Sequence, residues 1–239
     1  MTHAPKCFAA VLLGLCAATT RADGLIHHLP KDGRWAKYDL KIRFGDEGKS
    51  RTATGNVRIS SVGKATVKEA PCRWIELALT LESGGVQRTE TYKMLIPEVQ
   101  LKQGGDPLAH VVRAWRWRTG DEPKPLTDPA SPHRPLSGIL VGPPGRTETL
   151  KPAVIDSKLG RLKCAGVKGR KTLKNKDGKQ TAVVASTTRT HAKAPFGVVT
   201  LRIDYTFRRS KTFTEKGTMT FKLADFGGNA KSELPVKKS

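Results

Sequence analysis

The sequence lacks the signatures of the common enzyme classes. It contains no Gly-x-Ser-x-Gly, His-Glu-x-x-His, Gly-x-Gly-x-x-Gly or P-loop motif, so it shows none of the local patterns of a nucleophile elbow, a zinc protease or a nucleotide-phosphate cradle. Aromatic residues are also scarce, at 6%. We therefore expect a non-enzymatic protein, and we predict no catalytic residue, no cofactor and no metal site.

Long apolar runs are missing as well. The stretch from Phe8 to Ala18 is too short to cross a bilayer as a helix. Lys6 precedes it, and Thr20-Arg21-Ala22 places small residues at the −3 and −1 positions of a cleavage site. This order is typical of a secretory signal peptide. We expect removal of residues 1–22, export to the periplasm or the extracellular space, and a single β-rich domain over 23–239 with a basic C-terminal tail.

Acidic residues are half as numerous as basic ones, 21 against 43. Loss of Lys6 and Arg21 with the signal peptide lowers the net charge from +22 to +20. Such a charge attracts polyanions over distances that salt shortens. The basic stretch from Lys158 to Lys179 has no aromatic residue on which bases could stack, so no nucleic-acid partner is expected. The charge either holds the protein to an anionic envelope surface or keeps it soluble.

Cysteine is scarce in the mature chain, where only Cys72 and Cys164 remain. In an oxidising compartment these two thiols could form one disulfide. Alternatively, each is a separate buried thiol that packs as a small apolar side chain. The residues themselves leave both alternatives open.

What the chain does contain is alternation with a period of two. Apolar side chains occupy every second position in Tyr38–Phe44, from Ile75 to Leu81, and in Val199–Phe207, which is typical of antiparallel strands with one buried face. The pair Gly84-Gly85 separates two such runs and predicts a hairpin. In all, the pattern predicts nine or ten strands.

Residues 106–120 interrupt this alternation with a helical pattern. Asp106 and Pro107 suit the first positions of a helix, and Gly120 suits its end. An apolar stripe with helical spacing lies between them: Leu108, Val111, Val112 and Trp115. A second, shorter helix is predicted near 147–157. The Pro-rich segment 121–147 between them is either a lid or a connection between two halves of the sheet.

These elements predict an α+β, β-rich fold, in which a curved antiparallel sheet, an unclosed barrel, wraps around one or two helices. On the predicted helix, Trp115 and Trp117 point about 200° apart, so one of them could line a cavity. Aromatic side chains are over-represented in ligand cavities. Trp115, Trp117 and Tyr92 are therefore the candidate ligand-binding residues.

The order of elements, with Ala194-Pro195-Phe196-Gly197-Val198-Val199 leading into a late strand, resembles the LolA/LolB-like group of periplasmic half-barrel proteins. The resemblance implies a concave apolar face able to hold an acyl chain or another hydrophobic ligand, and it transfers no individual residue. We therefore expect a secreted or periplasmic protein that binds a hydrophobic or amphiphilic ligand, such as a lipid. The alternative is a structural, envelope-associated protein held to anionic surfaces by its positive charge.

Overall fold

The computed structural model describes residues 24–46, 49–83, 85–102, 107–126, 139–140, 146–174, 181–208 and 214–234. This part of the chain contains one 3-10 helix, η1 (Glu98–Gln100), and eleven strands. The strands are β1 (Trp35–Asp46), β2 (Lys49–Val67), β3 (Ala70–Ser83), β4 (Val86–Pro97), β5 (Arg113–Arg118), β6 (Lys124–Pro125), β7 (Arg146–Ser157), β8 (Gly160–Lys174), β9 (Thr181–Thr190), β10 (Val198–Arg208) and β11 (Thr214–Gly227).

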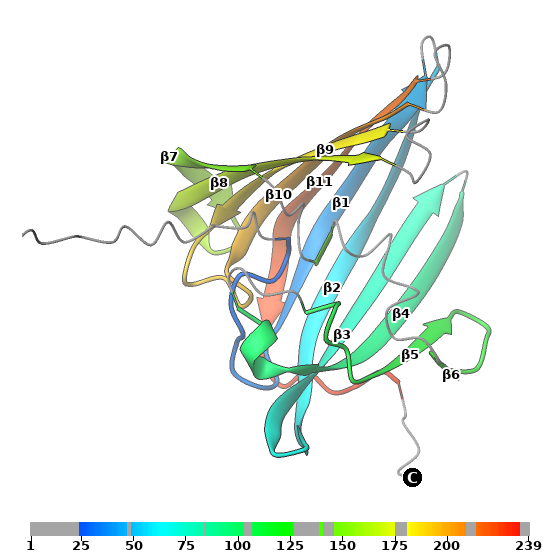
Figure 1. Cartoon of the computed structure of the whole chain (residues 1–239), viewed down its shortest axis with the longest axis vertical. Helices are drawn as coiled ribbons and strands as arrows, with labels where there is room; N and C mark the ends of the chain where they lie inside the picture. The colour runs from blue at the N-terminus through cyan, green and yellow to red at the C-terminus, as the bar shows by residue number, and fades with distance from the viewer. Residues whose placement is uncertain are drawn as a thin grey trace, which may run out of the picture.

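All eleven strands belong to one open antiparallel sheet, in the order β6-β5-β4-β3-β2-β1-β11-β10-β9-β8-β7. Each strand pairs with the next along the chain, apart from β6 and β7, and the first strand also pairs with the last (Figure 1). The two edges are therefore β6 and β7, and the Pro-rich segment carries the chain from one edge to the other. Figure 1 shows that the sheet is strongly curved. The prediction of an antiparallel, unclosed sheet is confirmed.

The prediction of an α+β fold wrapped around helices is wrong. Residues 107–110 form turns, and 113–118 form strand β5 in place of the predicted helix. The apolar stripe of 106–120 fits a helix, but Arg113 to Arg118 also alternates, and Trp is favoured in strands. Pairing with the edge of β4 decides between a helix and a strand here. Strand β5 pairs with β4 from Arg118 opposite Glu90 to Arg113 opposite Leu95.

The second predicted helix, at 147–157, is also wrong, because this segment is strand β7. It pairs with β8 through the tight turn at 158–159, and Gly160 adopts a φ of +90° there. Within the described residues, the only helical positions are those of η1 and residues 139–140. None of these helical segments is long and apolar enough to span a membrane.

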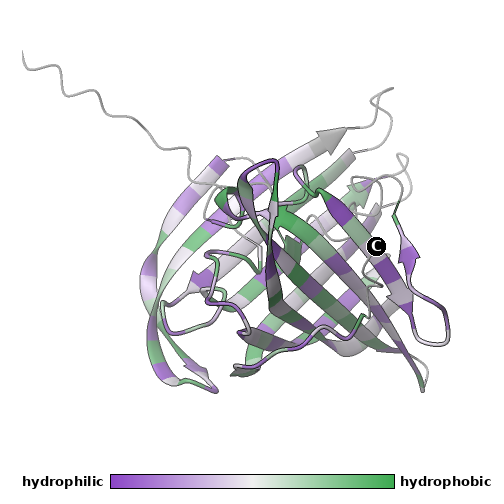
Figure 2. Cartoon of the chain, turned by 90° about the horizontal axis from the view of Figure 1, so that it is seen from below, coloured by the Kyte–Doolittle hydropathy of each residue, from purple (hydrophilic) through white to green (hydrophobic). Residues whose placement is uncertain are grey.

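The sheet buries one face, which we call the inner face and define by Tyr38, Ile59, Leu77, Met94 and Phe221. All five side chains are fully buried, and each lies at an alternate position of its strand, as period-two alternation requires. Figure 2 shows the resulting bands of hydrophobic and hydrophilic residues along the strands. The opposite, outer face carries most of the intervening polar and charged residues.

Segments outside the strands cover one end of the inner face. We call this the covered end; β1, β3 and β10 begin there. Leu25, Leu101, Leu140 and Phe196 each have 0% exposure and belong to the same apolar cluster as the inner-face side chains. Backbone hydrogen bonds join these segments, including Leu25 N to Ile139 O at 2.8 Å. The chain therefore fills this end of the curved sheet with its own side chains.

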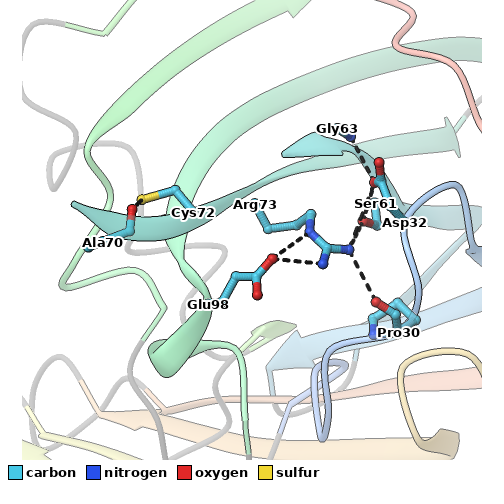
Figure 3. Close-up of polar contacts among 8 residues, drawn as sticks. All are labelled: Pro30, Asp32, Ser61, Gly63, Ala70, Cys72, Arg73 and Glu98. Atoms are coloured by element: carbon cyan, nitrogen blue, oxygen red, sulfur yellow. Dashed lines mark hydrogen bonds and ion pairs between the residues drawn. The ribbon is translucent and has the colours of Figure 1, made fainter. Parts of the chain in front are cut away.

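Arg73 attaches the N-terminal covering segment to the sheet (Figure 3). Its guanidinium donates to Glu98 Oε1 through Nε at 3.0 Å and Nη2 at 2.7 Å, and through Nη1 to Pro30 O at 3.2 Å and Ser61 Oγ at 2.9 Å. The Arg73 side chain is only 5% exposed. A single buried cation thus joins the segment before β1, strand β2 and η1.

Asp32 completes this cluster from the solvent side. Its Oδ1 accepts hydrogen bonds from Ser61 Oγ and from the Gly63 N–H, both at 2.9 Å. Partial burial opposes ionisation, but these hydrogen bonds and the charge of Arg73 outweigh it and lower the pKa of Asp32. Gly63 lies in the bulge of β2 with a φ of +133°, a backbone conformation that favours glycine.

Residues 232–234, the last that the structure describes, lie on the outer face. Ser232 Oγ donates to Glu76 Oε2 at 2.7 Å, and Lys93 Nζ donates to Ser232 Oγ at 2.8 Å and to Leu234 O at 3.3 Å. Leu234 is 1% exposed. Burial lowers the pKa of Lys93, and the charge of Glu76 opposes that shift. Two oppositely charged side chains of β3 and β4 therefore hold the end of the described chain.

Candidate functional site

The protein's own side chains cover the inner face at one end but not along its whole length. The burial of the apolar side chains along strand β3 shows this difference most simply. Ile75 and Leu77 are fully buried, whereas Leu79 and Leu81, two and four residues further on, are half-buried. All four side chains point to the same face because they alternate along one strand. We call the end of the inner face beyond Leu77, where β3 finishes and β4 begins, the open end.

A hollow of about 890 Å³ lies at this open end, over β3, β4 and β5. Leu79, Leu81 and Val86 supply apolar wall, and Val86 is 55% exposed. Arg88, Glu90, Arg118 and Asp121 are the charged residues of its lining. The hollow therefore combines apolar walls with a charged rim, which is the usual composition of a site for a small amphiphilic molecule.

The charges of the rim are arranged around Glu90. Its Oε1 accepts a hydrogen bond from Arg116 Nε and a second from Arg118 Nε at 3.2 Å. The Arg116 guanidinium also lies 5.8 Å from the centre of the Tyr92 ring. Burial, together with the negative charge of Glu90, raises the pKa of Tyr92 to about 12. Tyr92 therefore stays neutral at physiological pH, between the apolar core and the charged rim.

An apolar strip extends from the hollow across the sheet. Ala53 on β2 lies opposite Ile42 on β1, and Ile42 lies opposite Met219 on β11. All three are half-buried inner-face residues, like Leu79 and Leu81. These three residues lie outside the lining of the hollow, but they continue the partly exposed apolar surface of the inner face across β2, β1 and β11.

The structure separates the three residues predicted to bind a ligand. Tyr92 lies on the inner face beside the rim of the hollow, opposite Arg116. Trp115 lies on the outer face, where its ring is 5.5 Å from that of Trp74. Trp117 has the same parity on β5, so it also lies on the outer face, and its Nε1 donates to Asp121 O at 2.6 Å. The expected 200° divergence of the two tryptophans is wrong, because a strand places both on one side.

Cys72 and Cys164 are separate buried thiols in this structure. Cys72 Sγ donates to Ala70 O at 3.5 Å, and Cys164 Sγ donates to Leu162 O at 3.6 Å. Burial raises the pKa of Cys164. The described residues also contain no group of three or more His, Cys, Asp and Glu side chains that could hold a metal ion.

Sequence reasoning missed the charged rim, although part of its signal was present. Arg88 and Glu90 have the same parity as Tyr92 in Val86–Pro97, so alternation alone places them on one face of that strand. Arg116 and Arg118 join them only through the pairing of β5 with β4. With residues 106–120 predicted as a helix, that pairing was invisible.

No protein-family model matches the chain, and no curated protein matches it either. Among solved structures, it is similar to a DUF1329 family protein from Desulfovibrio piger, with 7% identity over 83% of this chain and 87% of that chain and a TM-score of 0.32. It is also similar to the beta-barrel-like protein of domain of unknown function DUF1849 from Brucella abortus, with 11% identity over 85% of this chain and 99% of that chain and a TM-score of 0.24. Neither is named for the LolA/LolB-like group, and likeness at these TM-scores carries no argument about function.

Proposed function

We propose that this protein binds a hydrophobic or amphiphilic ligand, such as a lipid, at the open end of its inner face. The observation that carries the proposal is the contrast along one strand between fully buried Leu77 and half-buried Leu81. The chain fills one end of its apolar face and leaves apolar surface over the other. A bound alkyl chain would remove that surface from water, at about 0.8 kcal/mol for each buried methylene group.

Two further features support this proposal. The hollow of about 890 Å³ falls within the size range of small-molecule sites, and the strip through Ile42 and Met219 adds partly exposed apolar surface on the same face of the sheet. The resemblance to the LolA/LolB-like half-barrels implies the same kind of ligand. Export through the residues 1–22 signal would place the protein where envelope lipids are found.

The binding of a neutral fluorescent lipid tests this proposal. The methyl ester of dansylaminoundecanoic acid should gain fluorescence with the wild-type protein and saturate at one site. Leu81→Gln should weaken its binding about ten-fold, because the variant loses apolar wall. Val154→Gln is the matched control, since Val154 is 54% exposed on edge strand β7; it should bind as the wild type does. No saturable binding, or equal binding by the two variants, would refute the proposal.

A second candidate function rests on the outer face. Lys41 and Arg43 on β1, with Lys216 and Lys222 on β11, are exposed side chains of the two central strands. Neighbouring cations of this kind favour an anionic surface, so we propose attachment to anionic envelope lipid. Co-sedimentation with phosphatidylglycerol vesicles, lost in high salt and in the variant with all four residues changed to Gln, is expected. Equal sedimentation with neutral phosphatidylcholine vesicles would contradict it.

A further inference from the structure

We infer that the ligand of the hollow is an amphiphile with an anionic head group, held at the rim by Arg88 and Arg118 while its apolar chain lies on the inner face. The inference rests on the proposed function and adds the chemical class of the ligand. It depends on which charges at the rim are already neutralised and which are not.

Two arginines of β5 pair with Glu90. It is a half-buried carboxylate, and both Arg116 and Arg118 donate to its Oε1. Side chains of Arg and Glu directly opposite each other on neighbouring strands attract, as Arg118 and Glu90 do here. Two guanidinium charges therefore more than offset the single negative charge of Glu90.

The arginines are not fully engaged. Arg118 uses only Nε on Glu90, so its terminal guanidinium nitrogens remain able to donate, and its side chain is 58% exposed. Arg88 lines the same hollow, and among the described residues no acidic side chain forms an ion pair with it. Arg88 and Arg118 thus line the hollow together with the carboxylates of Glu90 and Asp121, while Arg116 donates to Glu90 from beside it. Among the described residues, Arg88 is the one of these three arginines without a carboxylate partner, and it lies opposite Leu81.

The charge of Arg88 lies beside the apolar surface of the hollow. Arg88 lies directly opposite Leu81 in the pairing of β3 with β4, and both point into the hollow. A molecule whose chain covers Leu81 therefore brings its end close to the guanidinium of Arg88. Guanidinium groups form strong, directional hydrogen bonds to carboxylate, phosphate and sulfate oxygens, so an anionic head group fits this edge and a cationic one does not.

Comparison of dansylaminoundecanoic acid with its methyl ester tests the inference, because the two probes share the dansyl group and alkyl chain and differ at the head group, which is charged in the acid and neutral in the ester. At about pH 8 the carboxyl group is ionised, and we expect the wild-type protein to bind the acid about three- to ten-fold more tightly than the ester. Arg88→Gln should remove most of that preference, because it should weaken binding of the charged acid more than binding of the neutral ester. Lys41→Gln, which removes an exposed charge from the outer face, should preserve the preference.

Competition experiments show whether the site recognises an anionic amphiphile or an anion alone. Dodecyl phosphate and dodecanoate should displace the acid, whereas dodecyl maltoside should do so more weakly and inorganic phosphate should not displace it. Equal binding of acid and ester, or an unchanged preference in Arg88→Gln, would overturn the inference while leaving the proposed function standing. Displacement by inorganic phosphate would show a simple anion site and overturn it as well. Failure of both probes to bind would overturn the proposed function itself.

Discussion

Replacement of Arg73 by leucine should lower the free energy of unfolding by about 3 kcal/mol. Arg73 is 5% exposed, and its loss leaves Glu98 and Asp32 without their cation and Pro30 O without a donor. The expected cost lies at the lower end of the range for a broken buried ion pair, because Glu98 and Asp32 are 28% and 36% exposed. Urea denaturation at neutral pH measures the effect.

Arg202→Leu is the matched control for this prediction. Arg202 also pairs with a carboxylate, that of Asp204 at 2.8 Å, but these side chains are 58% and 45% exposed. Exposed pairs contribute little, so a change below about 1 kcal/mol is expected. Hydrogen exchange should also become faster at the Gly63 N–H in Arg73→Leu, since this N–H donates to Asp32. Similar costs for the two leucine variants would show that Arg73 does not anchor the covering segment.

Replacement of either of two leucines on β3 by alanine should affect stability and ligand binding in opposite order. Leu77→Ala removes a fully buried side chain from the covered end and should cost about 3 kcal/mol of stability. Leu81→Ala removes a half-buried side chain from the hollow and should cost about 1 kcal/mol, since much of that side chain is already in water. Urea denaturation of both variants measures the difference.

Binding of the neutral dansyl ester should show the reverse order. Leu81→Ala should weaken binding several-fold, at about 1 kcal/mol for the lost contact, whereas the folded fraction of Leu77→Ala should bind normally. Because the residue type, strand and face are the same, the pair isolates position along the inner face. Equal destabilisation by the two variants would mean that the open end is as well packed as the covered end.

Much of the sheet could be predicted from alternation. The inner-face residues of β3, from Ile75 to Leu81, and those of β1, from Tyr38 to Phe44, follow directly from a period of two in polarity. The hairpin between β3 and β4 follows from its glycine pair. These features are local, so a single sequence contains the information for them.

The remaining features depend on contacts between distant residues. The stripe from Leu108 to Trp115 satisfies a helical period, and only the unpaired edge of β4 turns part of this segment into β5. The same pairing brings Arg116 and Arg118 to Glu90, so the error in secondary structure also hid the rim of the hollow. The pairing of β1 with β11, which places the first and last strands side by side, has no local signal either.

The position of a bound alkyl chain tests the central claim most directly, and methionine methyl groups can report it. The chain contains Met94 at the covered end, fully buried, and Met219 on the apolar strip, half-buried. Leu81→Met, a substitution that nearly conserves volume, adds a reporter in the hollow. The protein labelled with carbon-13 at its methionine methyl groups is titrated with dodecyl phosphate and followed by NMR.

We predict that the methyl resonances at positions 81 and 219 shift and saturate together, while that of Met94 stays in place. Spin-labelled dodecyl phosphate should broaden the same two resonances. If saturating ligand leaves both of them unchanged, or moves only Met94, the open end of the inner face is not the binding site.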